Sequence, residues 1–399
     1  MKLLRVINTM DPVMGGLCQG IRNALPEWDK AGHTTHILSL DLPDAPFIAK
    51  ENLPLIPIGP AKTPWLYSPK LLPWLLNHLG EYDAVIVEGM WQCHSFSVTK
   101  AIRILKKRKQ VNIPKVFIMP HGMLDPYFQK APERRLKAIR NFLYWHLIEN
   151  RIINQADGIL FTCEEELRLA RTTFSNYHPK RELNVGFGIA LPAARTDDMD
   201  LQFAAICPMA AAKPYILFLS RIHPKKGADL LLQAYLEAYK KSERVDFPLL
   251  VVAGPGMDTP YGQSLLAFVE DNQLHEQVCF PGMLSGNAKW GAFYNCQAYA
   301  LTSHQENFGI SVVEAMACGR PVLISNQVNI WREIKAAGGG IVDNDDIQGV
   351  RIILNQWFEM SQENKKQMGV NAFNAFEKHF NIASASATMM NTIKSVYAQ

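Results

Sequence analysis

Two glutamates within residues 303–321 have the side chains and the spacing to hold the two ends of a charged, hydroxyl-rich ligand. Glu306 and Glu314 stand eight positions apart, and a helix-like apolar run begins near Phe308. At about 1.5 Å of rise per residue, their carboxylates lie on the order of 10 Å apart, which is too far to share a proton. That span matches the distance from a sugar ring to a ribose across a diphosphate. The amides over Phe308–Ile310 are unpaired helix-start donors, which suit an anion.

A second group of charged residues follows the apolar run at residues 215–220. It contains Arg221, Lys225 and Lys226. Arginine offers a bidentate fork and lysine a point charge, and together they form a good clamp for a diphosphate. Lys225 competes with Lys226 for this role, because the two are adjacent and equally charged. A surface turn with ordinary basic residues is the alternative, but a position at the end of a strand favours a binding role.

Glycines and one histidine stand where other apolar runs end. Gly15 and Gly16 come after the first run and before a helical stretch, where the backbone could approach a phosphate closely. No Gly-x-Gly-x-x-Gly and no P-loop pattern occurs, which disfavours standard NAD binding and P-loop chemistry. His121 could hydrogen-bond a sugar hydroxyl or a phosphate, although a lone histidine is more often structural. Gly282 and Met283 form a plain turn by residue type alone.

The elements that would position these residues alternate between strand and helix along both halves of the chain. Candidate strands are Leu3–Asn8, Thr34–Leu40, Ala84–Val87, Val116–Met119, Gly158–Phe161, Tyr215–Ser220, Leu249–Ala253, Gln277–Phe280, Ala298–Thr302 and Val322–Ser325. This alternation predicts an α/β fold with two parallel sheets, each covered by helices on both faces. A cleft then forms at the carboxyl ends of the strands in each domain, and we expect the two domains to face each other across a deep cleft.

Helices are expected between these strands. They are Leu17–Ala31, Pro132–Gln155, Ala228–Lys240, Tyr261–Asn272, Trp290–Cys296 and Trp331–Ala336. The second of them has an apolar face made of Leu136, Ile139, Leu143 and Leu147. The segment Thr162–Glu165 has capping-box spacing, so another helix should begin there.

The domain boundaries follow from where the periodicity stops. Residues 191–213 contain prolines and lack a regular pattern, so they are expected to link a domain at 1–190 to a domain at 214–383. Two more helices, Gln362–Phe380 and Ser384–Tyr397, have no strand to follow.

Length and composition are those of an ordinary globular protein. The chain has 399 residues, 48% hydrophobic and 20% charged, which suits two domains. No apolar run approaches the ~18 residues needed to span a bilayer, and the N-terminus looks like a first strand rather than a signal peptide. Seven cysteines are present without a Cys-x-x-Cys pair. Free thiols in a reducing cytoplasm fit best.

The net charge of +4 is unevenly distributed. Residues 1–190 hold 24 Lys and Arg against 17 Asp and Glu, a net +7, and the remainder carries −3. The surplus gathers at residues 100–109 and at Arg134, Arg135, Lys137 and Arg140. Such a surface could meet anionic lipid headgroups at the inner face of a membrane, or an anionic acceptor. The plainer interpretation of these basic residues is a solvated helix face. No nucleic-acid partner is expected.

The segment Ser303–Pro321 resembles the Glu-x7-Glu motif of the retaining, family-4 type glycosyltransferases (glycosyl transferases group 1). Residues 221–227 resemble that family's Arg-x-x-x-x-Lys-Gly stretch, and Gly15-Gly16 matches its glycine loop. The family has the GT-B architecture of two Rossmann-like domains, an acceptor-binding domain followed by a nucleotide-sugar-binding domain. In it the last helix, here about 384–399, packs back on the first domain. The segment at Val185–Ile189 departs from the family's usual Asn-Gly-Val pattern.

The resemblance implies that a sugar is transferred from a nucleotide-diphosphate-sugar, and a UDP- or GDP-sugar is favoured. It also implies that the anomeric configuration is retained and that no cofactor or metal takes part. Glu306 would hold sugar hydroxyls and Glu314 the ribose, and neither would be a nucleophile. Arg221, Lys226 and the helix amides would stabilise the leaving diphosphate. The catalytic residues expected are His121, Arg221, Lys226 and Glu306. The nucleotide-sugar is expected to contact Gly15, Gly16, Gly282, Met283, Asn307, Phe308, Gly309, Ile310 and Glu314.

Metal and acceptor sites are less defined. Asp343-Asn344-Asp345 gives the Asp-x-Asp pattern of another glycosyltransferase architecture, but Asp345 or Asp346 would make a good helix N-cap. The acceptor is expected to be a glycan or lipid-linked, in the synthesis of cell-surface polysaccharide or glycolipid. Trp65 and Trp74 lie in apolar stretches that suit an acceptor site, a membrane contact or a core equally well.

Three other functions fit the same residues. The chain could be a nucleotide-sugar epimerase, a sugar-phosphate synthase, or a catalytically silent partner that binds a nucleotide-sugar. The presence of Arg221, Lys226, Glu306 and Glu314 together argues against the silent partner.

Overall fold

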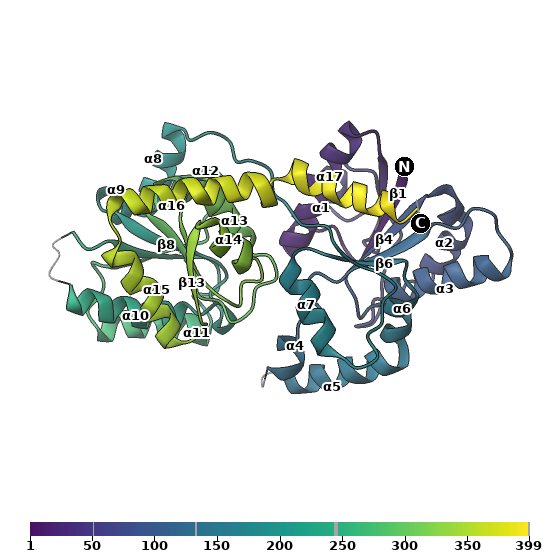
Figure 1. The fold of residues 1–399 in the computed structure, drawn as a ribbon, viewed down its shortest axis with the longest axis horizontal. Coiled ribbons are helices and arrows are strands. Elements are labelled where there is room, and N and C mark those ends of the chain that lie inside the picture. The colour runs from purple at the N-terminus through teal and green to yellow at the C-terminus, as the bar shows by residue number, and fades with distance from the viewer. Residues whose placement is uncertain (51, 132–133, 243–245, 398–399) are drawn as a thin grey trace. The chain divides into compact units, whose positions relative to one another are not determined.

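The computed structural model describes residues 1–50, 52–131, 134–242 and 246–397, and it divides into two compact units (Figure 1). The first unit is Met1–Gly188 together with Ile382–Gln399, and the second is Ile189–Asn381. Each unit is built on its own parallel sheet with helices around it, so the chain has a two-domain α/β fold.

The sheet of the first unit has seven strands in the order β3-β2-β1-β4-β5-β6-β7, and all pairs are parallel. The strands are β1 (Lys2–Ile7), β2 (Thr34–Ser39), β3 (Leu55–Pro57), β4 (Ala84–Glu88), β5 (Lys115–Met119), β6 (Gly158–Phe161) and β7 (Glu182–Asn184). The central strands are buried on both faces, which explains their continuous apolar sequences. The strand order reverses between β1 and β4.

The sheet of the second unit has six parallel strands in the order β10-β9-β8-β11-β12-β13. The strands are β8 (Tyr215–Leu219), β9 (Leu249–Ala253), β10 (Val278–Gly282), β11 (Ala298–Leu301), β12 (Val322–Ser325) and β13 (Gly340–Asp343). The order reverses between β8 and β11. In sheets of this kind, ligands bind beyond the carboxyl ends of the strands at such a reversal.

Every strand predicted from the sequence is confirmed, and three strands were missed. The missed strands β3, β7 and β13 all stand at a sheet edge, and two of them have three residues. Most of their residues are only half-buried, so they have no continuous apolar run to mark them.

The helices of the first unit are α1 (Gly16–Lys30), α2 (Leu71–His78), α3 (Cys93–Lys107), α4 (Tyr127–Lys130), α5 (Arg135–Tyr144), α6 (Asn150–Gln155), α7 (Glu164–Thr173) and α17 (Ile382–Ser395). Those of the second unit are α8 (Asp197–Ile206), α9 (Pro208–Ala212), α10 (Ala228–Lys241), α11 (Pro260–Asp271), α12 (Gly286–Asn295), α13 (Ile310–Ala317), α14 (Trp331–Ala337), α15 (Ile347–Glu359) and α16 (Gln362–Ala375). The predicted helices beginning at Leu17, Ala228, Tyr261, Trp290 and Trp331 are all present.

The segment expected to be a linker, residues 191–213, instead contains helices α8 and α9. Thr196 caps α8 with its side chain, which accepts from the amide of Met199, and Met199 and Phe203 are buried. Helix α8 packs against α12 inside the second unit. The short, Ala-rich helices show little apolar periodicity, which is why the sequence pattern missed them.

The helix predicted at Pro132–Gln155 is divided, and its apolar face is not buried. The residues Pro132 and Glu133 lie outside the described part, α5 ends at Tyr144, and a π-turn at Trp145–Glu149 leads into α6. The four residues of the predicted apolar face, Leu136, Ile139, Leu143 and Leu147, are all exposed. The core contact is made by Asn141 and Trp145 on another side of the helix.

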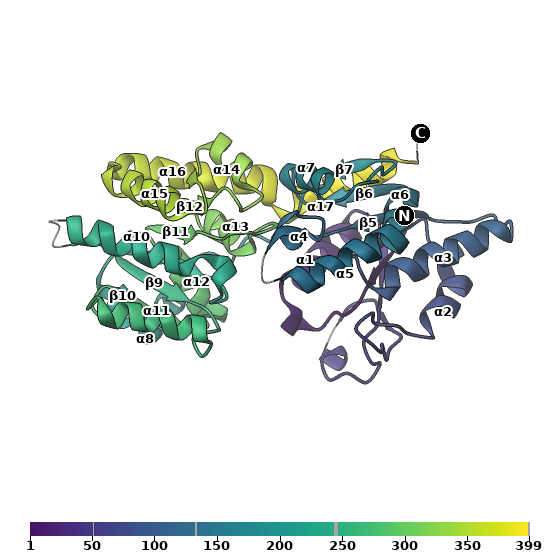
Figure 2. The ribbon, with the colours of Figure 1, turned by 90° about the horizontal axis from the view of Figure 1, so that it is seen from below.

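Helix α17 brings the end of the chain into the core of the first unit, where it packs against α1 (Figure 2). Met389, Met390 and Ile393 of α17 are buried in one cluster with Trp28 of α1 and Phe117 of β5. The predicted bounds of this helix, about 384–399, include residues 398 and 399, which lie outside the described part.

The two tryptophans left open by the sequence are half-buried in the first unit. Trp65 donates its indole N–H to the Tyr144 hydroxyl at 2.6 Å, and Trp74 stacks on His78. Their neighbours Leu71 and Leu75 are core residues. Among the described residues, no helix combines the length and the apolar character that crossing a bilayer requires.

Candidate functional site

Two loops of the second unit meet where its strand order reverses. The loop after β8 ends at Gly227, and the loop after β11 begins at Thr302. Gly227 has a left-handed φ of 68°, and a Cβ there would stand 2.1 Å from the Thr302 carbonyl oxygen. The Thr302 hydroxyl donates to the Gly227 carbonyl at 2.7 Å, and the His304 amide donates to the Lys225 carbonyl at 2.8 Å. Only glycine permits this close crossing of the two loops.

The crossing brings Lys226 against Glu306. The ammonium of Lys226 donates to the carboxylate of Glu306, and Lys226 is buried. The backbone around Glu306 is held at both sides, since its amide donates to the Gln327 carbonyl and its carbonyl accepts from the Asn329 amide, each at 2.9 Å. The carboxylate is therefore fixed in place before any ligand arrives.

Opposing effects act on the pKa of Glu306. Burial alone raises it, because an ionised carboxylate is poorly solvated in the interior. The charge and hydrogen bond of Lys226, the nearby charge of Lys225 and a hydrogen bond from the Gly309 amide outweigh burial, so the pKa lies below its ordinary value. Glu306 is thus ionised at neutral pH, and it can accept hydrogen bonds but not donate them.

The helix after Glu306 begins at Ile310, two residues beyond Phe308. Gly309 is its N-cap residue, with a left-handed φ of 75° and ψ of 64°. One of the amides expected to be unpaired, that of Gly309, already donates to Glu306. Phe308 is buried and packs edge-on against Phe380, so its ring belongs to the core of the unit.

Glu314 lies on α13 and is paired with a residue that the sequence analysis did not identify. Lys289 of α12 donates to the Glu314 carboxylate at 2.8 Å, and its ammonium also stands 4.2 Å from the centre of the Trp290 ring. Helices α12 and α13 are in contact. No motif marks a Lys–Glu pair 25 positions apart, so only the fold could reveal it.

The other predicted residues of this unit are more exposed. Arg221 follows β8 with an exposed side chain, and no hydrogen bond or ion pair of its guanidinium is found among the described residues. Gly282 ends β10 with a φ of 75°, a Cβ added there would meet nothing within 4 Å, and Met283 beside it is exposed. Asn307 accepts from the Asn329 side-chain amide at 3.4 Å.

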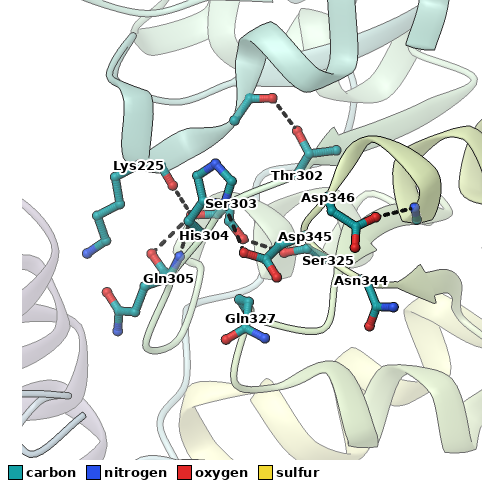
Figure 3. Close-up of polar contacts among 12 residues, drawn as sticks. Lys225, Thr302, Ser303, His304, Gln305, Ser325, Gln327, Asn344, Asp345 and Asp346 are labelled. Atoms are coloured by element: carbon teal, nitrogen blue, oxygen red, sulfur yellow. Dashed lines mark hydrogen bonds and ion pairs between the residues drawn. The ribbon is translucent and has the colours of Figure 1, made fainter. Parts of the chain in front are cut away.

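Figure 3 shows a polar network beside these loops that ties β11 to the segment after β13. His304 and Asp345 interact through Nδ1 and an Oδ atom at 2.8 Å. Asp346 caps α15 by accepting from the Gly349 amide at 2.8 Å, which confirms the predicted helix cap. Within the described residues, no cluster of His, Cys, Asp or Glu has the arrangement of a metal site. Asp345, the second acid of the Asp-x-Asp pattern, is paired with His304.

In the first unit, His121 is held by the buried carboxylate of Glu88. Its Nε2 donates to the carboxylate of Glu88 at 2.6 Å, and the same carboxylate accepts from Arg5 at 2.6 Å. Burial raises the pKa of Glu88. The charge of Arg5 and the hydrogen bond from His121 lower it by a larger amount, so the pKa lies below its ordinary value. His121 itself has a left-handed φ of 51°. Neither Arg5 nor Glu88 was predicted, although Glu88 directly follows the predicted strand at 84–87.

A second buried carboxylate supports the His121 turn. Glu166 of α7 accepts from the amide of Gly122 and from the amide and hydroxyl of Thr162. The reciprocal cap expected at Thr162–Glu165 is therefore shifted by one residue. Cys163 is the cap, its sulfur accepts from the Glu166 amide, and the acid that bonds back is Glu166.

Gly15 and Gly16 form the start of α1 after β1. Gly15 has φ 76° and ψ −133°, a conformation open to glycine alone, and both residues are exposed. No side chain accepts a hydrogen bond from the first amides of this helix as a cap. The structure thus brings only some of the predicted residues together, at the strand reversal of the second unit. Lys226, Glu306 and Gly309 are in direct contact, whereas Arg221, Gly282 and Met283 stand apart without a direct bond to them.

Comparison with known proteins identifies the family. The family described as "Glycosyl transferases group 1" matches residues 208–375, and the one described as "Glycosyl transferase 4-like domain" matches residues 15–182. The chain belongs to the group 1 glycosyltransferases. A relative from Mycobacterium sp. (strain JLS), D-inositol 3-phosphate glycosyltransferase, is 26% identical over 221 residues. The match covers 54% of this glycosyltransferase and 46% of the relative, so it spans less than half of the relative's length.

Solved structures match almost the whole glycosyltransferase at low identity. The Anabaena protein Alr3699/HepE, solved with UDP, has a TM-score of 0.72 and 16% identity, with 99% of this chain and 100% of that chain covered. Sucrose-phosphate synthase from Thermosynechococcus elongatus also has a TM-score of 0.72, at 19% identity, with 100% and 99% covered. The two-domain α/β fold is thus that of the GT-B glycosyltransferases.

Proposed function

We propose that this glycosyltransferase moves a sugar from a nucleotide-diphosphate-sugar to a glycan or lipid-linked acceptor, with retention of anomeric configuration. The observation that carries the proposal is the fixed contact of Lys226, Glu306 and Gly309 at the strand reversal of the second unit. At this contact, the ammonium of Lys226, the ionised carboxylate of Glu306 and the start of helix α13 lie together. A sugar linked to a diphosphate needs all three.

The leaving group is the main chemical problem, because the nucleoside diphosphate gains negative charge as the glycosidic bond breaks. Lys226 has three N–H donors and gives only part of them to Glu306, so it can also donate to a phosphate. Arg221, exposed at the same loop, supplies a bidentate fork. A positioned hydrogen-bond donor of this kind lowers the activation barrier by about 3–4 kcal/mol. The proposed scheme therefore requires no metal.

Glu306 would orient the sugar and Glu314 the ribose. An ionised carboxylate accepts from two neighbouring hydroxyls well, and the low pKa of Glu306 keeps it in that form. Lys289 would hold Glu314 in position in the same way that Lys226 holds Glu306. Neither glutamate is proposed as a nucleophile, and the leaving phosphate would help to deprotonate the acceptor on the same face of the sugar.

The first unit would bind the acceptor and contribute His121. With its Nε2 committed to Glu88, the imidazole has Nδ1 left to accept from a hydroxyl or, when protonated, to donate to an oxygen. The exposed glycine turn at Gly15 and Gly16 would let backbone amides approach a phosphate. Gly282 and Met283, at the end of β10, would lie near the base.

The donor that we favour is a UDP-sugar, with a GDP-sugar as the alternative. HepE, whose fold is similar, has been solved with UDP and with UDP-glucose. The mycobacterial relative is named for transfer to inositol 3-phosphate, an anionic acceptor, and the first unit here carries the positive charge excess. A role in cell-surface polysaccharide or glycolipid synthesis at the cytoplasmic face of a membrane fits these features.

The test is a transfer assay with a panel of UDP- and GDP-sugars and with glycan and polyprenyl-linked acceptors. We expect nucleoside diphosphate to be released only when an acceptor is present, and the product to keep the anomeric configuration of the donor by NMR. Conversion of the donor without any acceptor would instead identify an epimerase. An inverted product would contradict the proposed mechanism.

A further inference from the structure

The exposed face of α5 and the π-turn after it is unusually apolar. Five large apolar side chains there are more than half exposed. They are Leu136 (84%), Ile139 (59%), Phe142 (54%), Leu143 (55%) and Leu147 (69%). A surface helix normally turns its apolar stripe toward the core, and this one turns it away. Contiguous apolar surface of this kind marks an interaction site.

These side chains form one stripe rather than scattered spots. At about 100° per residue, the four that lie on α5 fall within an arc of about 120° around the helix axis. The residues that face the core, Asn141 and Trp145, lie on the far side. In Figure 1, α5 runs along the edge of the first unit beside α4.

The inner side of the helix is firmly attached, so the exposed stripe is not a sign of a loosely packed element. Trp145 is fully buried and donates its indole N–H to the Ser175 carbonyl at 2.8 Å. Tyr144 accepts from the Trp65 indole at 2.6 Å. The stripe is therefore presented on a fixed platform.

The charged side chains of the segment that carries the stripe, residues 134–148, are all basic. Arg135, Lys137 and Arg140 are exposed, and no acidic residue occurs between positions 134 and 148. By the same helical geometry, Lys137 and Arg140 border the stripe on one side and Arg135 lies at its N-terminal end. The first acid after the stripe, Glu149, is fully buried. An apolar stripe bordered by basic residues is the pattern of a helix that lies in the plane of an anionic membrane.

We propose that α5 and the following π-turn dock this glycosyltransferase on an anionic bilayer, with Leu136, Ile139 and Leu143 entering the headgroup boundary. The basic residues would lie at the level of the lipid phosphates, where each adds attraction to the surface. A second copy of the chain fits less well, because pairing through this face would bring the basic residues of two such segments together, and residues 134–148 contain no acid to offset them. The proposal deepens the proposed function, since it gives the enzyme direct access to a lipid-linked acceptor.

The test is vesicle flotation of the full chain without any nucleotide-sugar. Vesicles contain phosphatidylcholine alone or phosphatidylcholine with one-third phosphatidylglycerol. We expect at least tenfold more binding to the anionic vesicles, and a fall of at least tenfold in the Leu136→Ser/Leu143→Ser variant. The matched control is Leu201→Ser/Leu266→Ser, on α8 and α11, whose side chains are 69% and 39% exposed. It should bind as the wild type does.

Charge and oligomer measurements complete the test. Lys137→Glu/Arg140→Glu should lose binding to anionic vesicles, and raised salt should weaken the wild type. Equal binding by the Leu136→Ser/Leu143→Ser variant and the wild type would overturn the proposal. So would a concentration-dependent dimer that this variant dissociates, because the face would then belong to a second copy. Donor binding should be unchanged in all these variants, so a failed transfer assay and a failed vesicle assay are separate results.

Discussion

At the scale of single residues, each unit holds its candidate residues in compact groups of charged and hydrogen-bonding side chains. Lys226 with Glu306, Lys289 with Glu314, and Arg5 with Glu88 and His121 are three such groups. The sequence predicted both members of the first group, one member of the second and one member of the third. The partners Lys289, Arg5 and Glu88 lie 25, 116 and 33 positions away from the predicted residues along the chain, and no short motif can link them.

Replacing Glu306 by Gln tests the proposed role of its charge. Glutamine keeps the shape but cannot neutralise Lys226 or accept as strongly from sugar hydroxyls. We expect turnover to fall about 100-fold or more, in the range seen for loss of one transition-state contact. The measurement is initial rate with saturating donor, and the control is Glu359→Gln, an exposed residue at the end of α15. Turnover within twofold of the wild type would remove Glu306 from the mechanism.

Glu149 provides a prediction about pH and stability. Burial raises its pKa to about 8, so the folded chain holds this proton at pH values where the unfolded chain has released it. The resulting stability is complete below about pH 4.5 and is lost as the pH rises toward 8, by at most about 1.4 kcal/mol per pH unit. Urea unfolding at pH 5.5 and 8.5 should show Glu149→Gln gaining stability over the wild type at the higher pH. Parallel pH profiles of the two proteins would contradict the buried proton.

At the scale of elements, the central strands were predictable from the sequence. The edge strands and the direction in which α5 turns its apolar face were not. Central strands are buried on both sides and read as apolar runs, whereas the edge strands β3, β7 and β13 do not. The apolar periodicity of α5 was recognised, but periodicity shows only that a stripe exists. The stripe faces the exterior because Asn141 and Trp145, on the other side of the segment, are the residues buried in the core.

Gly309 caps the N-terminus of α13 beside Glu306, and Gly309→Ala tests whether this local geometry matters for ligand binding. Its left-handed φ costs an alanine about 1–2 kcal/mol, and the added Cβ would press on Val312 and on the Glu306 side chain at 3.1 and 3.3 Å. We expect lower stability and at least tenfold weaker nucleotide-sugar binding by calorimetry. Gly286→Ala is the matched control, since its φ is also positive but nothing lies within 4 Å. If both variants bind equally well, the local contact is unimportant.

At the scale of the whole molecule, the chain builds two units of comparable design, each a parallel sheet with one reversal of strand order. This α/β organisation and the family were predictable, because strand–helix alternation and the Glu-x7-Glu segment are both local patterns. The helices within residues 191–213 were not, since they have short, weakly patterned sequences.

Removal of residues 382–399 tests how the first unit is completed. Helix α17 supplies Met389, Met390, Ile393 and Val396 to the core that contains Trp28. Burial of a large apolar side chain contributes about 1.5–3 kcal/mol, so losing four should exceed the usual stability margin of a domain. We expect rapid proteolysis within residues 1–188 and a resistant core from the second unit. Equal protease resistance of both units would show that α17 is dispensable.

The most direct test of the central claim is calorimetric titration of nucleotide-sugars into the wild type and the Arg221→Ala/Lys226→Ala variant, with melting temperatures measured in parallel. The account predicts that at least one UDP- or GDP-sugar binds the wild type, and that the double variant stays folded but binds at least tenfold more weakly. If no nucleotide-sugar binds the wild type, or if the folded double variant binds equally well, the site is not a nucleotide-sugar site.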